Sequence, residues 1–291
     1  MAKLFGFVQF DFAGSLPLAE GRYLARSGDT GEEESVLVLG QTGAPPTPGR
    51  RRRGRGRTAA TEPEPLTLTR ATVIRAFSPF EDEEEAARWL DEACEAEDTV
   101  EVLASEGIAL LNRALHAQAV SAADPNGREL SAAQAERVLL GYGSGEETAD
   151  GRFTEARRVD LDAPPSSRRR RREEELRPQE RVAAVLRGRE RLDACETLLL
   201  RGRADLDAGR DREAALQLRV GLEALLVELR GALADPGHEE DLATLGERRA
   251  EAGEAANAAL RDELSDQQRA QIEELLALSE RVLRRRRVLR G

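Results

Sequence analysis

A chain of 291 residues is long enough for two domains that each bury a core without disulfides or metals. Its net charge of -11 argues against a protein built mainly to coat nucleic acid, because such binding needs a surplus of positive charge. The single lysine, Lys3, excludes a phosphate-binding loop of the Walker type, a pyridoxal Schiff base and a kinase-type lysine.

The two cysteines and the N-terminal residues indicate the cellular compartment of the protein. Cys94 and Cys195 stand far apart in segments with helical periodicity, which favours reduced core thiols over a disulfide. Gln9 and Asp11 interrupt the first apolar run too early for the core of a signal peptide. No stretch approaches the roughly 18 apolar residues of a membrane span. We therefore expect a cytoplasmic protein that makes no membrane contact.

The N-terminal part begins with strand-like alternation of side chains. Residues 3–12 hold four of the seven phenylalanines, so we expect a central strand that is covered on both faces near its start. A return strand is expected at 22–26, and two further strands at 36–39 and 66–76. Residues 42–65 are rich in proline, glycine and arginine, and they predict a disordered insertion.

Two helices are expected next. Acidic residues at 81–85 mark the start of the first, because negative charge in a first turn complements the helix dipole. Ala87, Leu90 and Cys94 mark its apolar side. The second helix is expected from about Thr99 to Ala119, and a further helical turn or two at 131–136.

A strand pair completes the N-terminal domain in this interpretation. Residues 138–142 and 153–159 flank a glycine-rich loop. The glycines of that loop lack the spacing of a dinucleotide fingerprint, and we expect no helix to begin there, so a hairpin loop is preferred to a phosphate site. Residues 1–163 are thus predicted to form an α+β domain, a small and mostly antiparallel sheet with helices on one face.

Residues 164–177 are predicted to form an arginine-rich linker. They include five consecutive arginines that are candidate contacts for an anion or a nucleic acid: Arg168, Arg169, Arg170, Arg171 and Arg172. Similar clusters stand at 50–57 and 284–287. No aromatic side chain is interleaved with any of them, so stacking on bases is not expected, and a solvated arginine-rich segment is the simpler interpretation.

Residues 178–291 are predicted to form a bundle of four antiparallel helices. One helical stripe runs from Val185 to Leu206 and a second from Ala215 to Ala232, and the short break at Gly209 predicts a hairpin. The candidate helix-packing interface consists of the leucines on these stripes: Leu192, Leu199, Leu218, Leu222, Leu225 and Leu229. The alternative is an extended hairpin that borrows a partner chain.

Two more helices are expected after residue 235. A weaker, alanine-rich stripe runs from Leu242 to Leu260. Ser265 and Gln268 have the spacing of a capping box, and they predict the start of a last helix with a stripe from Ile272 to Leu289.

Catalytic and metal-binding patterns are scarce in the sequence. His116 and His238 are the only histidines, and neither has a second ligand at helical spacing for zinc. The acids at 205–211 lack the glycine and the terminal glutamate of a calcium loop. We assign no catalytic, cofactor-binding or metal-ligating residue.

One fragment resembles a single tetratricopeptide-type hairpin. The residues that carry the resemblance have that family's alternation of small and large side chains: Leu198, Gly202, Gly209, Ala214, Leu218 and Gly221. The resemblance implies a helical hairpin of the kind that stacks on neighbouring repeats, although the family's closing proline is absent and no second copy of the repeat is found.

The predicted bundle is also similar in shape to a HEPN-type helical unit. RNA-cleaving members of that family carry an arginine followed four to six residues later by a histidine. Here Arg230 is separated from His238 by seven residues, and Arg113 from His116 by two. This departure argues against nuclease activity. The chain as a whole resembles uncharacterised proteins of high-GC, actinobacteria-like bacteria.

The leading functional hypothesis is a non-enzymatic interaction or scaffold protein. Its partner is another protein or a second copy of itself, bound through the helical bundle, and no cofactor is expected. The alternative is an RNA- or DNA-associated protein that contacts phosphates through its arginine clusters. A third hypothesis is a hydrolase that uses glutamates and His116, and it predicts a pocket with convergent carboxylates beside that histidine.

Overall fold

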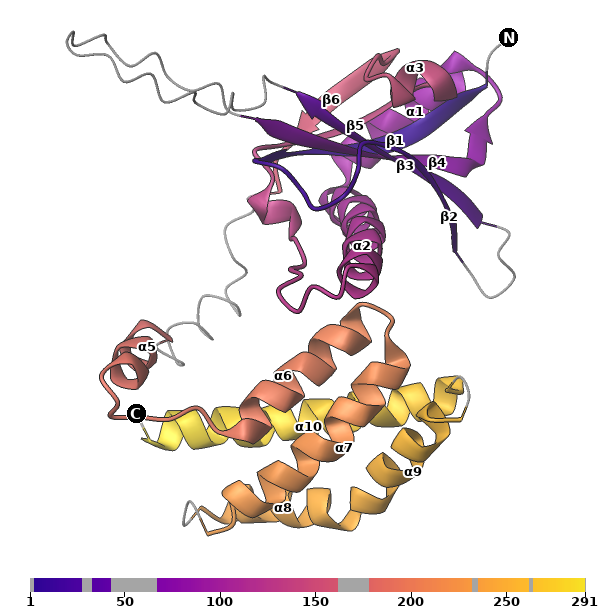
Figure 1. Ribbon diagram of the computed structural model, residues 1–291. Coiled ribbons are helices and arrows are strands. Elements are labelled where there is room, and N and C mark those ends of the chain that lie inside the picture. The colour runs from indigo at the N-terminus through magenta and orange to yellow at the C-terminus, as the bar shows by residue number, and fades with distance from the viewer. Residues whose placement is uncertain are drawn as a thin grey trace, which may run out of the picture. The chain divides into compact units, whose positions relative to one another are not determined.

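The computed structural model of the chain describes residues 3–27, 33–42, 67–161, 178–231, 235–261 and 264–290 (Figure 1). The chain divides into two compact units, Met1–Ala163 and Pro164–Gly291, and each has a hydrophobic core of its own. Apart from Thr42, the predicted insertion at 42–65 and the linker at 164–177 lie outside the described residues. The chain as a whole has the predicted α+β arrangement.

A six-stranded antiparallel sheet forms the centre of the first unit. In their order across the sheet, the strands are β2 (Gly21–Ser27), β3 (Glu33–Thr42), β4 (Leu68–Phe80), β1 (Leu4–Ala13), β5 (Arg137–Ser144) and β6 (Glu155–Val159). The prediction of a central first strand is confirmed, because β1 lies between β4 and β5 and is buried on both faces from Gly6 to Phe12.

The position of β2 differs from the prediction of a strand returning along β1. Both edges of β1 are occupied, since Phe10 is paired with Ala71 of β4 and with Val138 of β5. β2 pairs instead with β3, at the margin of the sheet. Its exposed Leu24 fits this place, because an edge strand has fewer neighbours to cover its side chains.

One face of the sheet is covered by α1 (Glu83–Glu95) and α2 (Glu97–Ser121), and the 3-10 turn η1 (Ala132–Gln134) follows them. The carboxylate of Asp82 caps α1 by accepting the N–H of Glu85 at 2.8 Å. Leu90 is buried as predicted, but Ala86 and Ala93 occupy the inner positions that were assigned to Ala87 and Cys94. Ala87 and Cys94 are partly buried and pack against the same core, so the predicted face is confirmed at Leu90 and its centre lies slightly to one side of the predicted one.

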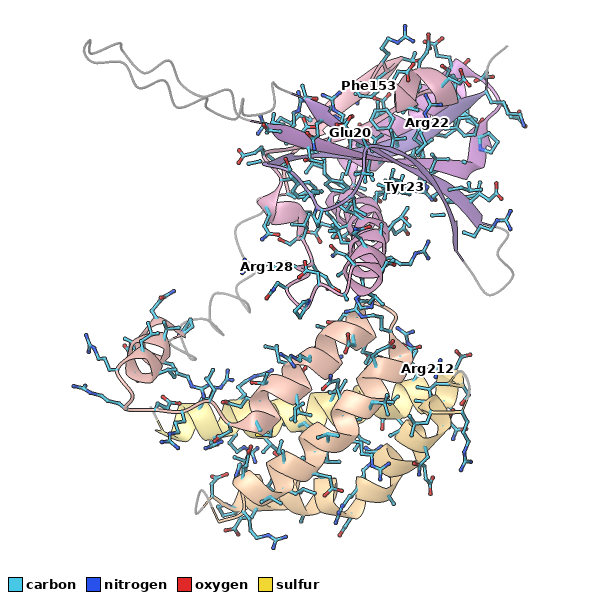
Figure 2. The ribbon with its side chains drawn as sticks, in the orientation of Figure 1. Glu20, Arg22, Tyr23, Arg128, Phe153 and Arg212 are labelled. Atoms are coloured by element: carbon cyan, nitrogen blue, oxygen red, sulfur yellow. The ribbon has the colours of Figure 1, made fainter. Side chains whose placement is uncertain are left out.

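The opposite face of the sheet carries a short helix, α3 (Gly145–Ala149), where the sequence predicted a loop without a helix. Gly143 makes this possible, because a Cβ at that position would lie 2.6 Å from Oγ1 of Thr148 in α3. The glycine thus permits close packing of α3 against β5. The ring of Phe153 stacks on Phe7 of β1 with centroids 4.5 Å apart. Figure 2 shows Phe153 and Arg22 on the side of the sheet opposite to Tyr23.

The second unit is helical. Its helices are α5 (Pro178–Leu186), α6 (Ala194–Asp207), α7 (Asp211–Glu228), α8 (Pro236–Glu247), α9 (Arg249–Ala259) and α10 (Asp266–Arg290). The predicted hairpin is confirmed for α6 and α7, which turn at Gly209 with a φ of +70°. The capping box of α10 is also confirmed: the N–H of Ser265 donates to Oε1 of Gln268 at 3.0 Å, and the N–H of Gln268 to Oγ of Ser265 at 3.3 Å.

Two predicted helices are each divided in the structure. The stripe from Val185 to Leu206 is split between α5 and α6, because Asp193 starts a new helix through a capping box with Glu196. The carboxylate of Glu228 reinforces this start by accepting the N–H groups of Ala194 and Cys195 at 3.2 and 3.0 Å. The stripe from 242 to 260 is divided at Arg248, between α8 and α9. The prediction of a four-helix bundle is therefore wrong in helix number, because the described residues of the second unit form six helices.

Candidate functional site

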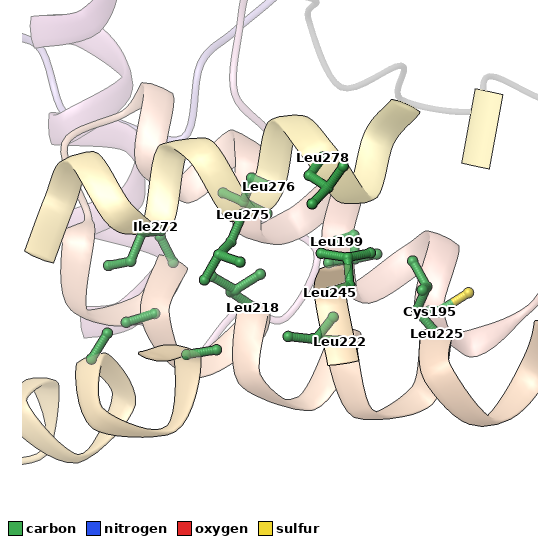
Figure 3. Close-up of a cluster of buried hydrophobic side chains, with 14 of the residues drawn as sticks. Cys195, Leu199, Leu218, Leu222, Leu225, Leu245, Ile272, Leu275, Leu276 and Leu278 are labelled. Carbon is green, nitrogen blue, oxygen red and sulfur yellow. The ribbon is translucent and has the colours of Figure 1, made fainter. Parts of the chain in front are cut away.

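Five of the six leucines of the predicted packing interface lie in the interior of the helical unit. Figure 3 shows Leu199, Leu218, Leu222 and Leu225 among them. None of these five is more than 1% exposed: Leu199, Leu218, Leu222, Leu225 and Leu229. Leu192 is different, because it lies in the connection before α6 and is 59% exposed. The buried leucines join α6 and α7 to α8, α9 and α10 within one chain, so they are not a surface for a partner.

Three of the four arginines in the C-terminal cluster at 284–287 form ion pairs within the helical unit. Arg285 lies 3.1 Å from Asp241 of α8, and the buried Arg286 pairs with Asp193 before α6. Arg287 binds Glu196 of α6 at 3.1 Å. These three guanidinium groups hold α10 in place and are not free to contact phosphates. The clusters at 50–57 and at Arg168 to Arg172 lie outside the described residues.

Glu196 is the centre of a buried ion network. Arg181 of α5 binds both of its carboxylate oxygens, at 2.9 and 2.6 Å, and Arg287 of α10 binds one of them. Burial alone raises the pKa of Glu196, but the hydrogen bonds and charges of Arg181 and Arg287 outweigh burial and bring the pKa below its usual value. The network therefore stabilises the packing of α5, α6 and α10.

The two histidines lie in contrasting surroundings. His116 is exposed on α2. His238 is buried in α8, and neither ring nitrogen has a hydrogen-bond partner among the described residues. Burial lowers the pKa of His238, Asp235 and Asp241 act to raise it, and Arg285 and Arg286 of α10 lower it further, so that the net shift is downward. A neutral imidazole is therefore favoured inside the bundle.

A cavity of about 310 Å³ lies in the first unit where α1 ends and α2 begins, beside β6. Its lining includes the thiol of Cys94, whose pKa is raised chiefly by burial, and Arg157, which is held by Asp91 at 2.7 Å and Glu155 at 2.8 Å. His116 is remote, because it follows the cavity residue Glu101 by about 22 Å along α2. The cavity thus lacks the pairing of carboxylates with His116 that the hydrolase hypothesis requires.

The buried thiol of the second unit is also a poor nucleophile. Burial and the hydrogen bond and charge of Glu228 raise the pKa of Cys195. Among the described residues, no three histidine, cysteine, aspartate or glutamate side chains are placed to hold a metal ion. Within the described residues, the remaining unexplained feature is an exposed apolar surface.

The outer face of α7 carries an unpartnered row of apolar side chains. We use the name α7 outer face for Leu216, Val220 and Val227, together with Glu213 and Arg230 at its ends. The three apolar side chains are 36%, 55% and 74% exposed. Spacings of four and seven residues place them on one side of the helix, opposite to the buried leucines. The row is a second, shorter stripe on a helix that already has a core stripe.

The charged residues at the two ends of the α7 outer face have opposite signs. Glu213 lies in the first turn of α7, and Arg230 lies just after the helix. Both are exposed, and neither forms an ion pair within the part of the chain that the structure describes. Glu223, between the two valines, is instead held within the chain by Arg249 of α9. The α7 outer face is thus apolar in the middle, acidic at one end and basic at the other.

A second feature of interest is the row of arginines on the face of the sheet that carries α3. Strand register places Arg22, Arg70, Arg137 and Arg158 on this face. The buried carboxylate of Asp11 binds Nε of Arg70 at 3.3 Å and Nε of Arg137 at 2.8 Å. Asp11 therefore neutralises part of this positive charge, and Arg70 and Arg137 stabilise the sheet through their bonds to it.

Comparisons with models of known protein families, with curated proteins and with solved structures find no match. In the described part of the chain, no helix combines the length and the apolar character that crossing a bilayer requires. Function is therefore inferred from geometry and chemistry alone.

Proposed function

We propose that the protein is a non-enzymatic, cytoplasmic interaction protein whose helical unit binds a second copy of the chain through the α7 outer face. One observation carries the proposal: Leu216, Val220 and Val227 are exposed along one side of a helix whose other side is closed into a core. Isolated apolar side chains on a surface are ordinary, but a row at helical spacing offers a continuous strip to another helix.

Charge favours a second copy as the partner. A helix that carries glutamate at one end of its strip and arginine at the other is complementary to the same helix running in the opposite direction. Glu213 and Arg230 have this arrangement, and neither charge has a partner among the described residues. Apolar contact between the two strips supplies the affinity, since burial of apolar area is worth about 25 cal/mol per Å².

Light scattering over a range of protein concentrations tests the proposal. The weight-average mass of the wild type should rise above 31.9 kDa with concentration, whereas Val220→Glu should remain at 31.9 kDa. Val102→Glu on α2 is the matched control, because Val102 is also 55% exposed, and it should associate as the wild type does. A wild type that stays at 31.9 kDa at high micromolar concentration contradicts the proposal, as does unchanged association of Val220→Glu.

A second candidate function is contact with RNA or DNA through arginines. The arginine row on the α3 side of the sheet supports it, because Arg158 is exposed at one end, and Arg22 at the other end is exposed as well, although it is paired with Asp150 at 2.9 Å. Counterion release requires that such binding weaken steeply with salt. An electrophoretic shift that disappears at moderate salt, and on replacement of Arg168 to Arg172 or of Arg22 and Arg158 by alanine, would support this candidate. The absence of a shift at low salt rejects it.

A further inference from the structure

We infer that the two copies pair α7 against α7 in antiparallel register, about a two-fold axis at the level of Gly221 and Leu222. The inference rests on the proposed function and adds the arrangement of the partner. In this register Leu216 faces the partner's Val227, and Val220 faces the partner's Glu223. At each end, Glu213 faces the partner's Arg230. A two-fold axis makes every such contact occur twice.

The spacing of the seam supports helix-to-helix packing. Positions 213, 216, 220, 223 and 227 of α7 follow one another at alternating intervals of three and four residues, and Arg230, just past the end of the helix, is three residues further on. This is the heptad spacing by which two helices lie side by side along a seam. The seam is also self-complementary about its centre, because Leu216 exchanges with the apolar Val227, Val220 exchanges with Glu223, and the two end charges have opposite signs. The seam is self-complementary only when the two helices run antiparallel.

Charge selects the antiparallel direction. In a parallel pair, Glu213 would face the partner's Glu213 and Arg230 would face the partner's Arg230, and like charges would meet at both ends. In the antiparallel pair, each charge meets its opposite. Exposed ion pairs add little affinity, but repulsion between like charges disfavours the wrong arrangement. The end charges thus set direction and register.

The centre of the seam buries no uncompensated charge. Val220 meets the partner's Glu223, whose carboxylate is held by Nε of Arg249 within its own chain. The methylene groups of Glu223 are then available to cover Val220. Arg219, beside the seam, donates from Nη1 to Oδ1 of Asn257 at 3.1 Å and is directed toward α9. With only three apolar side chains from each copy, the expected product is a weak, concentration-dependent dimer.

Disulfide trapping tests the register. The variants are Leu216→Cys and Val227→Cys, each made with Cys94→Ser so that the only other thiol is the buried Cys195. One variant carries a tag that separates the products on a non-reducing gel. In the inferred register, positions 216 and 227 of different copies face each other. Two copies of position 216 are instead about 16 Å apart, eleven residues along the helix, which is beyond the reach of a disulfide.

The mixture of both variants should therefore cross-link under mild oxidation, and each variant alone should not. Cross-linking of each variant alone indicates parallel pairing and overturns the inference. If light scattering shows a dimer that depends on Val220 but the mixture does not cross-link, the register is wrong and the proposed function survives. If the wild type is monomeric at all concentrations, the proposed function fails and the inference fails with it.

Charge reversal gives a second, independent readout. Glu213→Arg and Arg230→Glu should each weaken dimerisation severalfold at low salt, because each puts two like charges at both ends of the seam. The double variant should recover wild-type association, since both ion pairs are restored with their signs exchanged. Glu106→Arg, at an exposed position of α2 in the first unit, controls for the change in net charge. Single variants that dimerise as the control does, or a double variant weaker than either single, would overturn the role of these charges.

Discussion

Replacing Gly202 and Gly221 by alanine, one at a time, measures how closely α6 and α7 pack. Both glycines lie within helices, where alanine is favoured over glycine by about 1 kcal/mol. Their surroundings differ. A Cβ at Gly202 would meet Cβ of Gln217 and Cδ2 of Leu276 at 3.4 Å, which is ordinary van der Waals contact. A Cβ at Gly221 would lie 3.0 Å from both Cγ and Cδ2 of the buried Leu199.

Gly202→Ala should therefore stabilise the chain by about 0.5–1 kcal/mol, because it gains helix propensity without a clash. Gly221→Ala gains the same propensity but overpacks the core, which costs about 1–3 kcal/mol, so it should be neutral to destabilising by about 2 kcal/mol. Urea denaturation followed by circular dichroism at 222 nm compares the two. Equal free energies of unfolding for the two variants would refute the close approach of the helices at Gly221.

Three further predictions concern buried polar groups of the helical unit and the thiols. Burial lowers the pKa of His238 in the folded state, so the unfolded chain takes up a proton first and the stability of the protein should fall as pH drops through 6.5. The melting temperature of His238→Leu should therefore depend less steeply on pH than that of the wild type. Equal pH dependence in the two proteins would contradict this. Glu196→Ala leaves Arg181 without its bidentate partner and should lower the free energy of unfolding, measured by urea titration, by about 3 kcal/mol. A change near zero would argue against the network. Cys94 should react with a thiol reagent in the folded protein much faster than the buried Cys195, and reversal of that order would show the bundle to be open.

Local periodicity was sufficient to predict several elements, because their determinants lie close together in sequence. The alternation at 3–12 identifies the buried strand β1, and the spacing of Leu218, Leu222 and Leu225 identifies α7. Strand order could not be predicted in this way. It depends on contacts such as Phe10 with Val138, which lie far apart in the chain and leave no local pattern.

The division of the helix expected from Val185 to Leu206 shows a second limit. A stripe of apolar residues continues through positions 188 and 192, but Asp193 caps a new helix with Glu196 and with Glu228 from α7. A cap of that kind includes a residue more than thirty positions away, so periodicity alone does not reveal it. Leu192 was assigned to the packing face for this reason.

The candidate site was missed because α7 carries two apolar stripes. The longer stripe, with Leu218 and Leu222, dominates any search at helical spacing, and the sequence does not show which stripe faces the core. The arginines at 284–287 present a related problem. Their acidic partners Asp193, Glu196 and Asp241 are remote in sequence, so a structural cluster has the same appearance as a basic tail.

The α7 outer face is expected to join two copies of the chain. Sedimentation equilibrium of the wild-type protein tests it most directly, because it yields mass as a function of concentration without labels or substitutions. The predicted result is a reversible rise from 31.9 kDa toward twice that mass. A constant mass of 31.9 kDa up to high micromolar concentration would contradict the claim.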